Sequence, residues 1–151
     1  FDINVNGPFL LMRETIPYMQ KTGAGSIINI ASIGGLVCLS ERVGYCTTKA
    51  ALIMMTKQAA RDFGKDNIRC NAVCPGFVLT PMTEGHFGGI SKDAFVGSPM
   101  QRGATPDELS GICSYLASDD ASYTTGAVIT VDGGSTVVDG FEVGIIASTK
   151  E

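Results

Sequence analysis

Residues 26–31, with the sequence Ser-Ile-Ile-Asn-Ile-Ala, form a short and almost continuous apolar run. A run of this kind, preceded by glycines, predicts a β-strand buried on both faces, as in parallel sheets. The segments on either side have apolar residues at helical spacing, from Pro8 to about Lys21 and from about Tyr45 to Phe63. Gly64 is expected to end the second of these helices.

The same alternation continues toward the C-terminus. Arg69–Cys74 and Val128–Asp132 read as two further strands. A helix is predicted from Thr105 to about Ala117, because Thr105, a proline and Glu108 form a capping box. The segment from Leu79 to Arg102 shows no period, so it is predicted to be a long mobile loop of the kind that acts as a functional lid.

Helices that alternate with buried strands imply right-handed crossovers and a parallel sheet, hence an open α/β fold. Ligands of such folds bind beyond the carboxyl ends of the strands. Ser32, Pro75-Gly76 and Gly133-Gly134 fall at these ends, so we expect the site there.

The composition excludes several classes of protein. A net charge of −4 without a Lys/Arg cluster argues against nucleic-acid and membrane partners, and an apolar content of 44% argues against disorder. No apolar run is long enough to cross a membrane. The five cysteines lack paired spacing, which predicts reduced thiols in a cytoplasmic protein without a metal site.

Tyr45 and Lys49 are the first candidates for chemistry. Four residues apart on a helix, they share one face, and the ammonium group is expected to lower the pKa of the phenol. Such a tyrosine can exchange a proton with an alcohol or ketone. The alternative is an exposed helix pair without a function. Ser32 supports the first interpretation, because its hydroxyl can reach the same pocket, and Asn4, just before the first helix, adds to it. Gly34 and Gly35 fit either a pocket wall or a plain turn.

In their order and spacing these motifs resemble the short-chain dehydrogenase/reductase family, in particular its ketoacyl-reductase-like branch. The matching pieces are Asn4, Ser32, Tyr45 to Ala50, Arg69 to Gly76, Thr80, Thr125-Gly126 and Val131 to Gly134.

The resemblance implies an enzyme that transfers a hydride between NAD or NADP and a secondary alcohol or ketone. Tyr45 would be the general acid/base, Ser32 would bind the substrate oxygen, Lys49 would hold the nicotinamide ribose, and Asn4 would hold a water molecule in a proton relay. The implied cofactor-binding residues are Ile30, Tyr45, Lys49, Pro75, Gly76, Val78 and Thr80.

The family also implies a Rossmann-like, doubly wound parallel sheet of seven strands. Residues 1–151 would be the C-terminal catalytic portion of that single domain, with about three of the strands. No G-x-G-x-x-G motif occurs, so the N-terminal half that binds the dinucleotide phosphates is expected to be absent, leaving the first strand with an unpaired edge.

The first two helices correspond to the family's dimer and tetramer contacts, so a homo-oligomer, such as a homotetramer, is expected. Two other hypotheses stay open. The chain is either a truncated, non-catalytic module that binds a partner, or a family member with non-redox chemistry such as epimerisation or dehydration.

Overall fold

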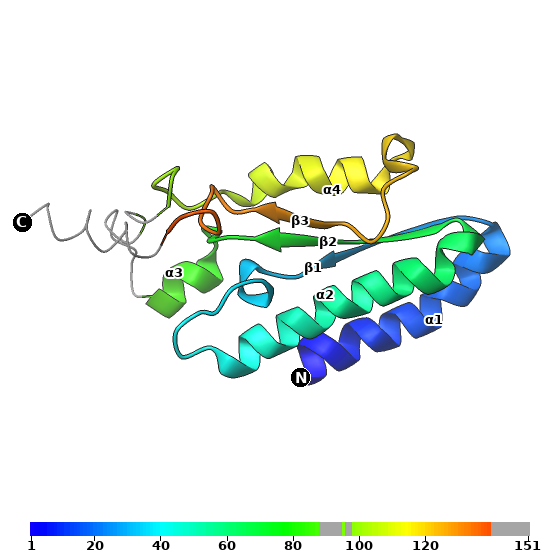
Figure 1. The fold of residues 1–151 in the computed structure, drawn as a ribbon, viewed down its shortest axis with the longest axis horizontal. Helices are drawn as coiled ribbons and strands as arrows, with labels where there is room; N and C mark the ends of the chain where they lie inside the picture. Colours follow the sequence, from blue (N-terminus) through cyan, green and yellow to red (C-terminus); the bar gives the residue numbers. More distant parts are fainter. Residues whose placement is uncertain (88–94, 96–97, 140–151) are drawn as a thin grey trace, which may run out of the picture.

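The computed structural model describes residues 1–87, 95 and 98–139. Its centre is a sheet of three parallel strands, in which β2 lies between β1 and β3 (Figure 1). The strands are β1 (Gly25–Ile30), β2 (Ile68–Pro75) and β3 (Val128–Val131). All three therefore end at the same edge of the sheet, as the open α/β prediction requires.

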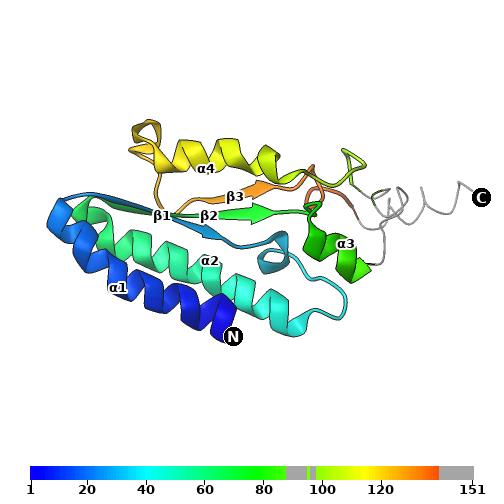
Figure 2. The same ribbon diagram turned by 180° about the vertical axis from the view of Figure 1, so that it is seen from behind.

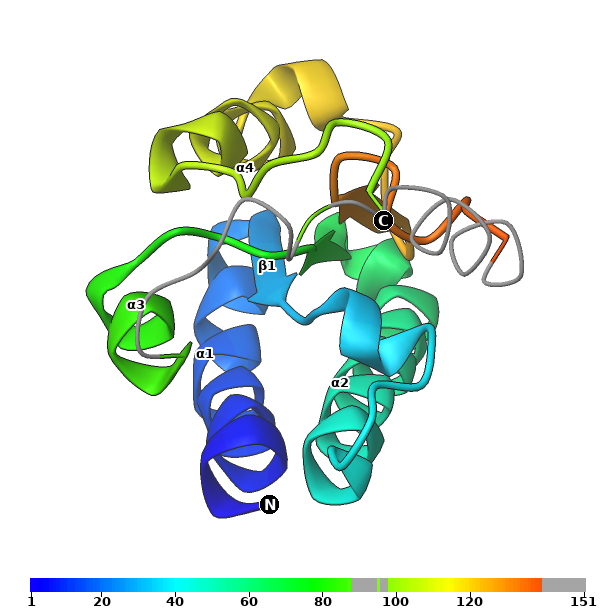
Figure 3. The ribbon, with the colours of Figure 1, turned by 90° about the vertical axis from the view of Figure 1, so that its left-hand side faces the viewer.

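Helices cover both faces of this sheet. The long helices α1 (Gly7–Thr22) and α2 (Val43–Phe63) lie on one face, and the shorter α4 (Ser110–Ala117) lies on the other (Figure 2). Figure 3 shows the resulting three layers end-on, with α1 and α2 side by side beneath the strands. The doubly wound architecture is confirmed for this part of the sheet. In the described ranges, no helix has the length and apolar character needed to span a membrane.

Strand β2 carries most of the core, because both of its faces are covered. Toward α1 and α2 its small side chains pack against apolar helix residues; toward α4, Val73 packs with Leu116 and Ala121. The buried residues on the α1–α2 side are Met12, Ile16, Ala31, Leu52, Ile53, Ala59, Ala60, Ile68, Cys70, Ala72 and Cys74.

Strand β1 corrects the first prediction. It was expected to be buried on both faces, yet most of its residues are only partly buried and Ile30 is 50% exposed. The reason is its position: β1 lies at an edge, and within the described residues it pairs only with β2.

The end of α2 also differs in detail. Gly64 keeps a right-handed helical backbone and begins a short 3₁₀ turn, Gly64–Asp66, and the left-handed residue that turns the chain is Asn67, at φ 57°. Asparagine tolerates this conformation better than most residues do. The helix therefore ends where it was predicted to end, with Gly64 as its C-cap, and the left-handed turn follows at Asn67.

The segment predicted as a loop contains a helix, α3 (Pro81–Phe87). Thr80 precedes it and exchanges two hydrogen bonds with Thr83: the Thr80 N–H donates to the Thr83 hydroxyl at 2.9 Å, and the Thr83 N–H donates to the Thr80 hydroxyl at 3.2 Å. This is the reciprocal pattern of a capping box, with threonine in place of the usual glutamate. The remainder of the predicted lid, residues 88–94 and 96–97, lies outside the described residues.

The two ends of this segment are joined. Val78 forms a parallel bridge with Ala104, and the Leu79 N–H donates to the Ala104 carbonyl at 2.8 Å. The Ala104 N–H in turn donates to the Phe77 carbonyl at 2.9 Å. The chain therefore leaves the sheet edge after β2 and comes back beside its point of departure.

The predicted capping box at Thr105 is present: the Glu108 carboxylate accepts the Thr105 N–H at 2.9 Å. The helix that was predicted to start here begins with a 3₁₀ turn, Pro106–Leu109, which leads into α4. Glu108 also forms two hydrogen bonds of 2.7 Å with the Arg102 guanidinium. These contacts lower the pKa of Glu108 to about 2, the Arg102 hydrogen bond being the main cause.

Candidate active site

A cavity of about 410 Å³ opens at the carboxyl edge of the sheet, bordered by residues that follow β1 and β2 and by the start of α2. Ser32, Tyr45, Gly76 and Val78, four of the residues predicted from the sequence, line it. They come from three separate parts of the chain, and the parallel strand order brings them together. We call this the Tyr45 cavity.

Ser32 is fixed in the wall of the Tyr45 cavity by the turn it begins. Its backbone is extended, and its hydroxyl oxygen accepts the Gly34 N–H at 3.0 Å, which starts a 3₁₀ turn at Ile33–Gly35. The residue is only 8% exposed. Because this bond uses the oxygen as an acceptor, the hydroxyl proton is left to donate to a substrate oxygen.

Tyr45 and Lys49 lie one turn apart on α2, as predicted. Tyr45 is 40% exposed, and the Lys49 ammonium lies 5.9 Å from the centre of its ring. The Lys49 Nζ donates a hydrogen bond to the Ile30 carbonyl at 3.0 Å. Burial lowers the pKa of Lys49, and the nearby Cys74 thiol partly opposes this. The lysine therefore links α2 to the end of β1.

Proximity of a tyrosine and a lysine is not enough to make such a site. Tyr18 and Lys21 on α1 form a similar pair, with the ammonium 5.4 Å from the ring centre. Neither of them borders the Tyr45 cavity, and Tyr18 is 69% exposed. The cavity and Ser32 distinguish Tyr45 from this exposed pair.

Asn4 lies in a short π-helical segment, Asp2–Asn6, that leads into α1. Its side-chain amide donates to the Thr48 hydroxyl at 3.1 Å, and Thr48 donates to the Tyr45 carbonyl at 2.8 Å. Asn4 thus contacts the residue next to Lys49. Asn6, the neighbouring asparagine, bonds instead to the Asp2 carboxylate at 2.8 Å, away from the site.

Asn4, Ile30 and Lys49 border a second cavity, also about 410 Å³, between α1, α2 and β1. The predicted residues are therefore divided between two hollows. Ser32 and Tyr45 face one, while Asn4 and Lys49 face the other. Lys49 lies between them, since its ammonium is also close to the Tyr45 ring.

Two predicted cofactor-binding residues border neither cavity. Pro75 is the last residue of β2, and Thr80 caps α3 with its hydroxyl, which lies 3.1 Å from that of Thr83. Thr80 therefore has a local structural role, and its role toward a cofactor stays a prediction.

The glycines after Ser32 have a packing reason. A Cβ on Gly34 would lie 3.0 Å from the Tyr45 ring, and one on Gly35 would lie 2.8 Å from the backbone of Lys49. Both glycines let the turn approach α2 closely. The sequence suggested a pocket wall or a turn conformation as the reason for these two glycines, and neither interpretation predicted their close approach to α2.

Several lining residues were missed: Ile33, Leu39, Arg42, Phe77 and Thr83 also border the Tyr45 cavity. Arg42 is the N-cap residue of α2 and its backbone is not helical, so helical spacing from Tyr45 did not predict its place in the cavity wall. Within the ranges the structure describes, no three His, Cys, Asp or Glu side chains are grouped to hold a metal ion.

The fold and this geometry define an open α/β protein with serine, tyrosine and lysine at the carboxyl edge of its sheet. Residues 1–136 match the family model described as enoyl-(acyl carrier protein) reductase. The chain is 38% identical to 2-(R)-hydroxypropyl-CoM dehydrogenase of Xanthobacter autotrophicus over 90% of its own length and 55% of that enzyme. It is 40% identical to 3-oxoacyl-[acyl-carrier-protein] reductase FabG of Thermotoga maritima, over 88% and 54% of the two chains.

Solved structures agree. A mutant of 4-hydroxyisoleucine dehydrogenase, complexed with NADH and succinate, superposes with a TM-score of 0.87 at 36% identity, over 92% of this chain and 58% of that one. The chain belongs to the short-chain dehydrogenase/reductase family. It spans about half the length of the curated relatives it matches.

Proposed function

We propose that this chain is the catalytic portion of an oxidoreductase that transfers a hydride between NAD(H) or NADP(H) and a secondary alcohol or ketone. The observation that carries the proposal is that Ser32 and Tyr45 line one cavity at the carboxyl edge of the sheet, with Lys49 one turn beyond. The names of the relatives, which are dehydrogenases and a reductase, support it.

In this proposal the chain's own residues bind the substrate oxygen and move its proton. The Ser32 hydroxyl donates a hydrogen bond to the oxygen, and the Tyr45 hydroxyl gives it a proton during reduction or removes one during oxidation. The Lys49 ammonium lies beside Tyr45, 5.9 Å from the centre of its ring. Asn4 is proposed to hold a water molecule in a relay that carries the proton to solvent.

The space and its lining fit a nicotinamide ring beside a small substrate, because cavities of a few hundred cubic ångströms hold ligands of that size. Gly76 and Val78 would border the ring there, and Pro75 and Thr80 would support the turn that carries them. Lys49, bonded to the Ile30 carbonyl, would bind the ribose hydroxyls. When bound, the cofactor supplies or accepts the hydride.

The test is turnover of the full-length protein, followed as absorbance of the reduced nicotinamide with both cofactors and a panel of ketones and secondary alcohols. Tyr45→Phe is expected to lower kcat by about 10²- to 10⁴-fold, since it removes the proton-transferring group. Tyr18→Phe, from the exposed tyrosine–lysine pair on α1, is the matched control and should leave kcat unchanged. Equal activity of the Tyr45→Phe variant would refute the mechanism.

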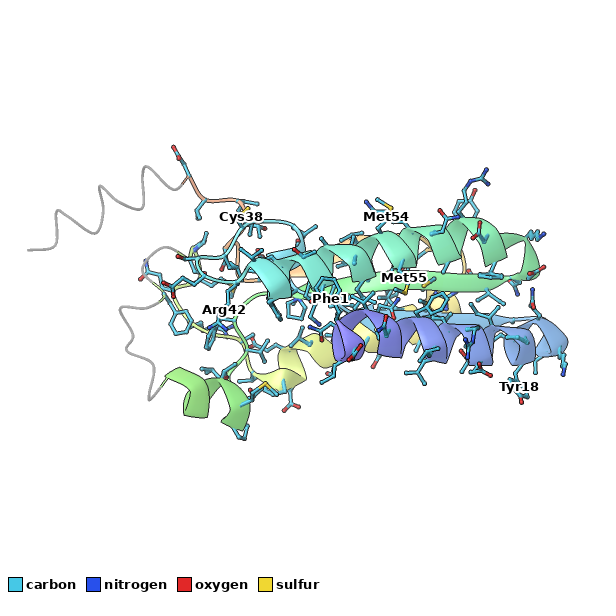
Figure 4. All side chains as sticks on the ribbon, turned by 90° about the horizontal axis from the view of Figure 1, so that it is seen from below. Phe1, Tyr18, Cys38, Arg42, Met54 and Met55 are labelled. Carbon is cyan, nitrogen blue, oxygen red and sulfur yellow. The ribbon has the colours of Figure 1, made fainter. Side chains whose placement is uncertain are left out.

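We also propose a cytoplasmic location and a homo-oligomer, either a dimer or a tetramer. All five cysteines are free, which supports a reducing compartment. Figure 4 looks onto α1 and α2, where Tyr18 and Met54 lie at the surface. Phe9 and Leu10 on α1 are also exposed. Exposed apolar side chains on these two helices are typical of a subunit contact.

Sedimentation tests the oligomer. Met54→Glu places a charge on the exposed face of α2, so it is expected to shift the protein toward smaller species. Ser114→Glu makes the same change in charge at an exposed position on α4, on the other face of the sheet, and is the control. A wild-type protein that sediments as a monomer at all concentrations would refute the contact.

A further inference from the structure

Among the residues that the structure describes, the polar side chains that border the Tyr45 cavity are Ser32, Arg42, Tyr45 and Thr83. Ser32 and Tyr45 supply the two hydroxyls of the proposed reaction. The Thr83 hydroxyl is engaged locally, because it accepts the Thr80 N–H at 2.9 Å and donates to the Val78 carbonyl at 2.8 Å. Arg42 is exposed at the start of α2. Beyond the two reacting hydroxyls, the described wall therefore offers little to a hydroxyl-rich ligand.

The other side chains of this wall are apolar. Ile33, Phe77 and Val78 are partly buried, whereas Leu39 is 37% exposed and Met82 is 81% exposed. They come from the segments that follow β1 and β2, and Figure 3 shows α3 and the turn before α2 on two sides of the end of β1. Exposed apolar side chains that line one hollow differ from scattered ones, because a single apolar ligand removes them from water together.

Leu39 lies next to the proposed proton donor. A Cβ added to Gly34 would be 3.0 Å from the Tyr45 ring and 3.1 Å from a Leu39 methyl group, so both side chains lie against the same glycine. Gly34 is itself buried, and its N–H is held by the Ser32 hydroxyl at 3.0 Å. Hydrocarbon attached to the reacting carbon of a substrate would therefore lie close to Leu39.

We propose that the Tyr45 cavity takes an uncharged ketone or secondary alcohol whose reacting carbon carries hydrocarbon groups, and that Leu39 and Met82 select it. This inference rests on the function proposed above and names the substrate class of the same site. Ser32 and Tyr45 bind the oxygen, while the hydrocarbon covers Leu39 beside the ring and Met82 on α3. Burial of apolar surface on both partners favours binding, and the flexible methionine adapts to the shape of the ligand.

A substrate rich in hydroxyl groups, such as a sugar, fits this wall poorly. Each hydroxyl that leaves water needs a new hydrogen-bond partner, and leaving it without one costs more than a typical hydrogen bond contributes. Ile33, Leu39 and Met82 have no side-chain group that could serve as this partner. The cavity therefore discriminates among substrates by the polarity of the groups around the reacting carbon.

The experiment uses the full-length protein and cyclohexanones that carry alkyl groups of increasing length on the carbon opposite the ketone. Each is paired with the analogue in which a hydroxyl replaces the terminal methyl group, so that the size is nearly unchanged. The alkyl member is expected to have the higher kcat/KM, by about 10-fold or more. Leu39→Asn should lower kcat/KM for the alkyl member by about 10-fold and leave the hydroxyl member nearly unchanged, because an amide of similar size replaces the apolar contact.

Leu36→Asn is the matched control, since it makes the same substitution at a side chain that is 45% exposed and lies outside the lining of the cavity. It should keep the preference for the alkyl members, and so should the apolar replacement Leu39→Met. Met82→Gln tests the opposite wall at an exposed position and should weaken the preference as Leu39→Asn does. Equal kcat/KM within the pairs for the wild-type protein overturns the proposal, and so does a preference that both Leu39→Asn and Met82→Gln retain.

A binding measurement separates this inference from the proposed function. If none of the ketones is turned over with either cofactor, the redox proposal fails for this panel, and calorimetric titration with the same pairs decides the character of the cavity. Tighter binding of the alkyl member that is weakened in Leu39→Asn but kept in Leu36→Asn upholds the apolar site. Equal binding of the two members, tighter binding of the hydroxyl member, or no binding of either overturns it.

Discussion

Thr48 connects three parts of the candidate site through one hydroxyl group. It is 3% exposed, accepts a hydrogen bond from Asn4 and donates one to the Tyr45 carbonyl. Its neighbour in the chain is Lys49. The position of Asn4 relative to α2 thus depends on a residue to which sequence reasoning gave no role.

Replacing Thr48 tests this connection. Thr48→Ala is expected to lower the free energy of unfolding by about 1–3 kcal/mol, because the Asn4 amide loses its buried acceptor. Thr48→Ser keeps the hydroxyl and should retain most of the stability. Urea denaturation of the two variants measures the difference. Equal stabilities for the alanine and serine variants would show that the Asn4–Thr48 hydrogen bond contributes nothing.

How far the site could be predicted also depends on individual residues. Ser32 and Tyr45 were predictable together, since strand ends and helix starts meet at one edge of a parallel sheet. Leu39 and Arg42 were not, because their place in the cavity depends on the left-handed backbone of Glu41, which follows no sequence rule. Asn4 and Lys49 border a different cavity from Ser32 because of how whole elements pack together, and local sequence patterns do not encode that packing.

At the scale of elements, the contact between the 3₁₀ turn Ile33–Gly35 and α2 governs how α2 is placed. Gly35→Ala would bring a Cβ to 2.8 Å from the Lys49 backbone, so the turn or the helix must move. We expect a loss of about 1–3 kcal/mol in unfolding free energy from this overpacking. The Ile30–Lys49 hydrogen bond should weaken as well.

Gly44→Ala, in α2 itself, is the matched control for Gly35→Ala. A Cβ there meets no atom within 4 Å, and Gly44 lies in the first turn of α2. Alanine is expected to stabilise the helix by about 0.5–1 kcal/mol. Thermal unfolding of both variants should therefore give shifts of opposite sign, and shifts of the same sign would contradict the packing argument.

The start of α4 predicts a dependence on pH. Glu108 in the folded chain has a pKa of about 2, against an ordinary value of 4.5. Because the folded value is lower, the stabilisation is fully present above pH 4.5 and is lost as the pH falls toward 2. The stability difference between wild type and Glu108→Gln should be constant from pH 7 to 5 and shrink below that. Urea denaturation at each pH measures it.

Arg102→Gln provides the companion test, because it removes the other half of the ion pair. Its stability difference from wild type should narrow over the same range of pH. A difference that stays constant down to pH 3 in both variants would show that the ion pair does not lower the pKa of Glu108.

The long elements could be predicted from the sequence to within about two residues, as is common for strongly periodic segments. The short helix α3 could not. Seven residues are too few for a period to show, and its cap uses Thr83 where the familiar pattern has glutamate. The Thr-Pro start shared by residues 80–81 and 105–106 was the signal that was available.

For the molecule as a whole, the order β1-β2-β3 determines how strongly each strand is protected from amide hydrogen exchange. β2 is paired on both sides, whereas β1 pairs within the described residues only with β2. In a chain of these 151 residues, we expect peptides from β2 to exchange their amide hydrogens most slowly and peptides from β1 to exchange faster. Hydrogen exchange followed by mass spectrometry measures this. Equal protection of β1 and β2 would show that another strand pairs with the edge.

The closed ends of the segment between Phe77 and Ala104 have a consequence for evolution and engineering. The hydrogen bonds that join these ends fix where the chain leaves and rejoins the sheet, whatever lies between them. The segment between Phe77 and Ala104 can therefore be exchanged for another, while the elements that carry Ser32, Tyr45 and Lys49 keep their positions. Grafting the corresponding segment of another family member should be tolerated by this scaffold, and new substrate ranges can arise by replacing one piece of chain.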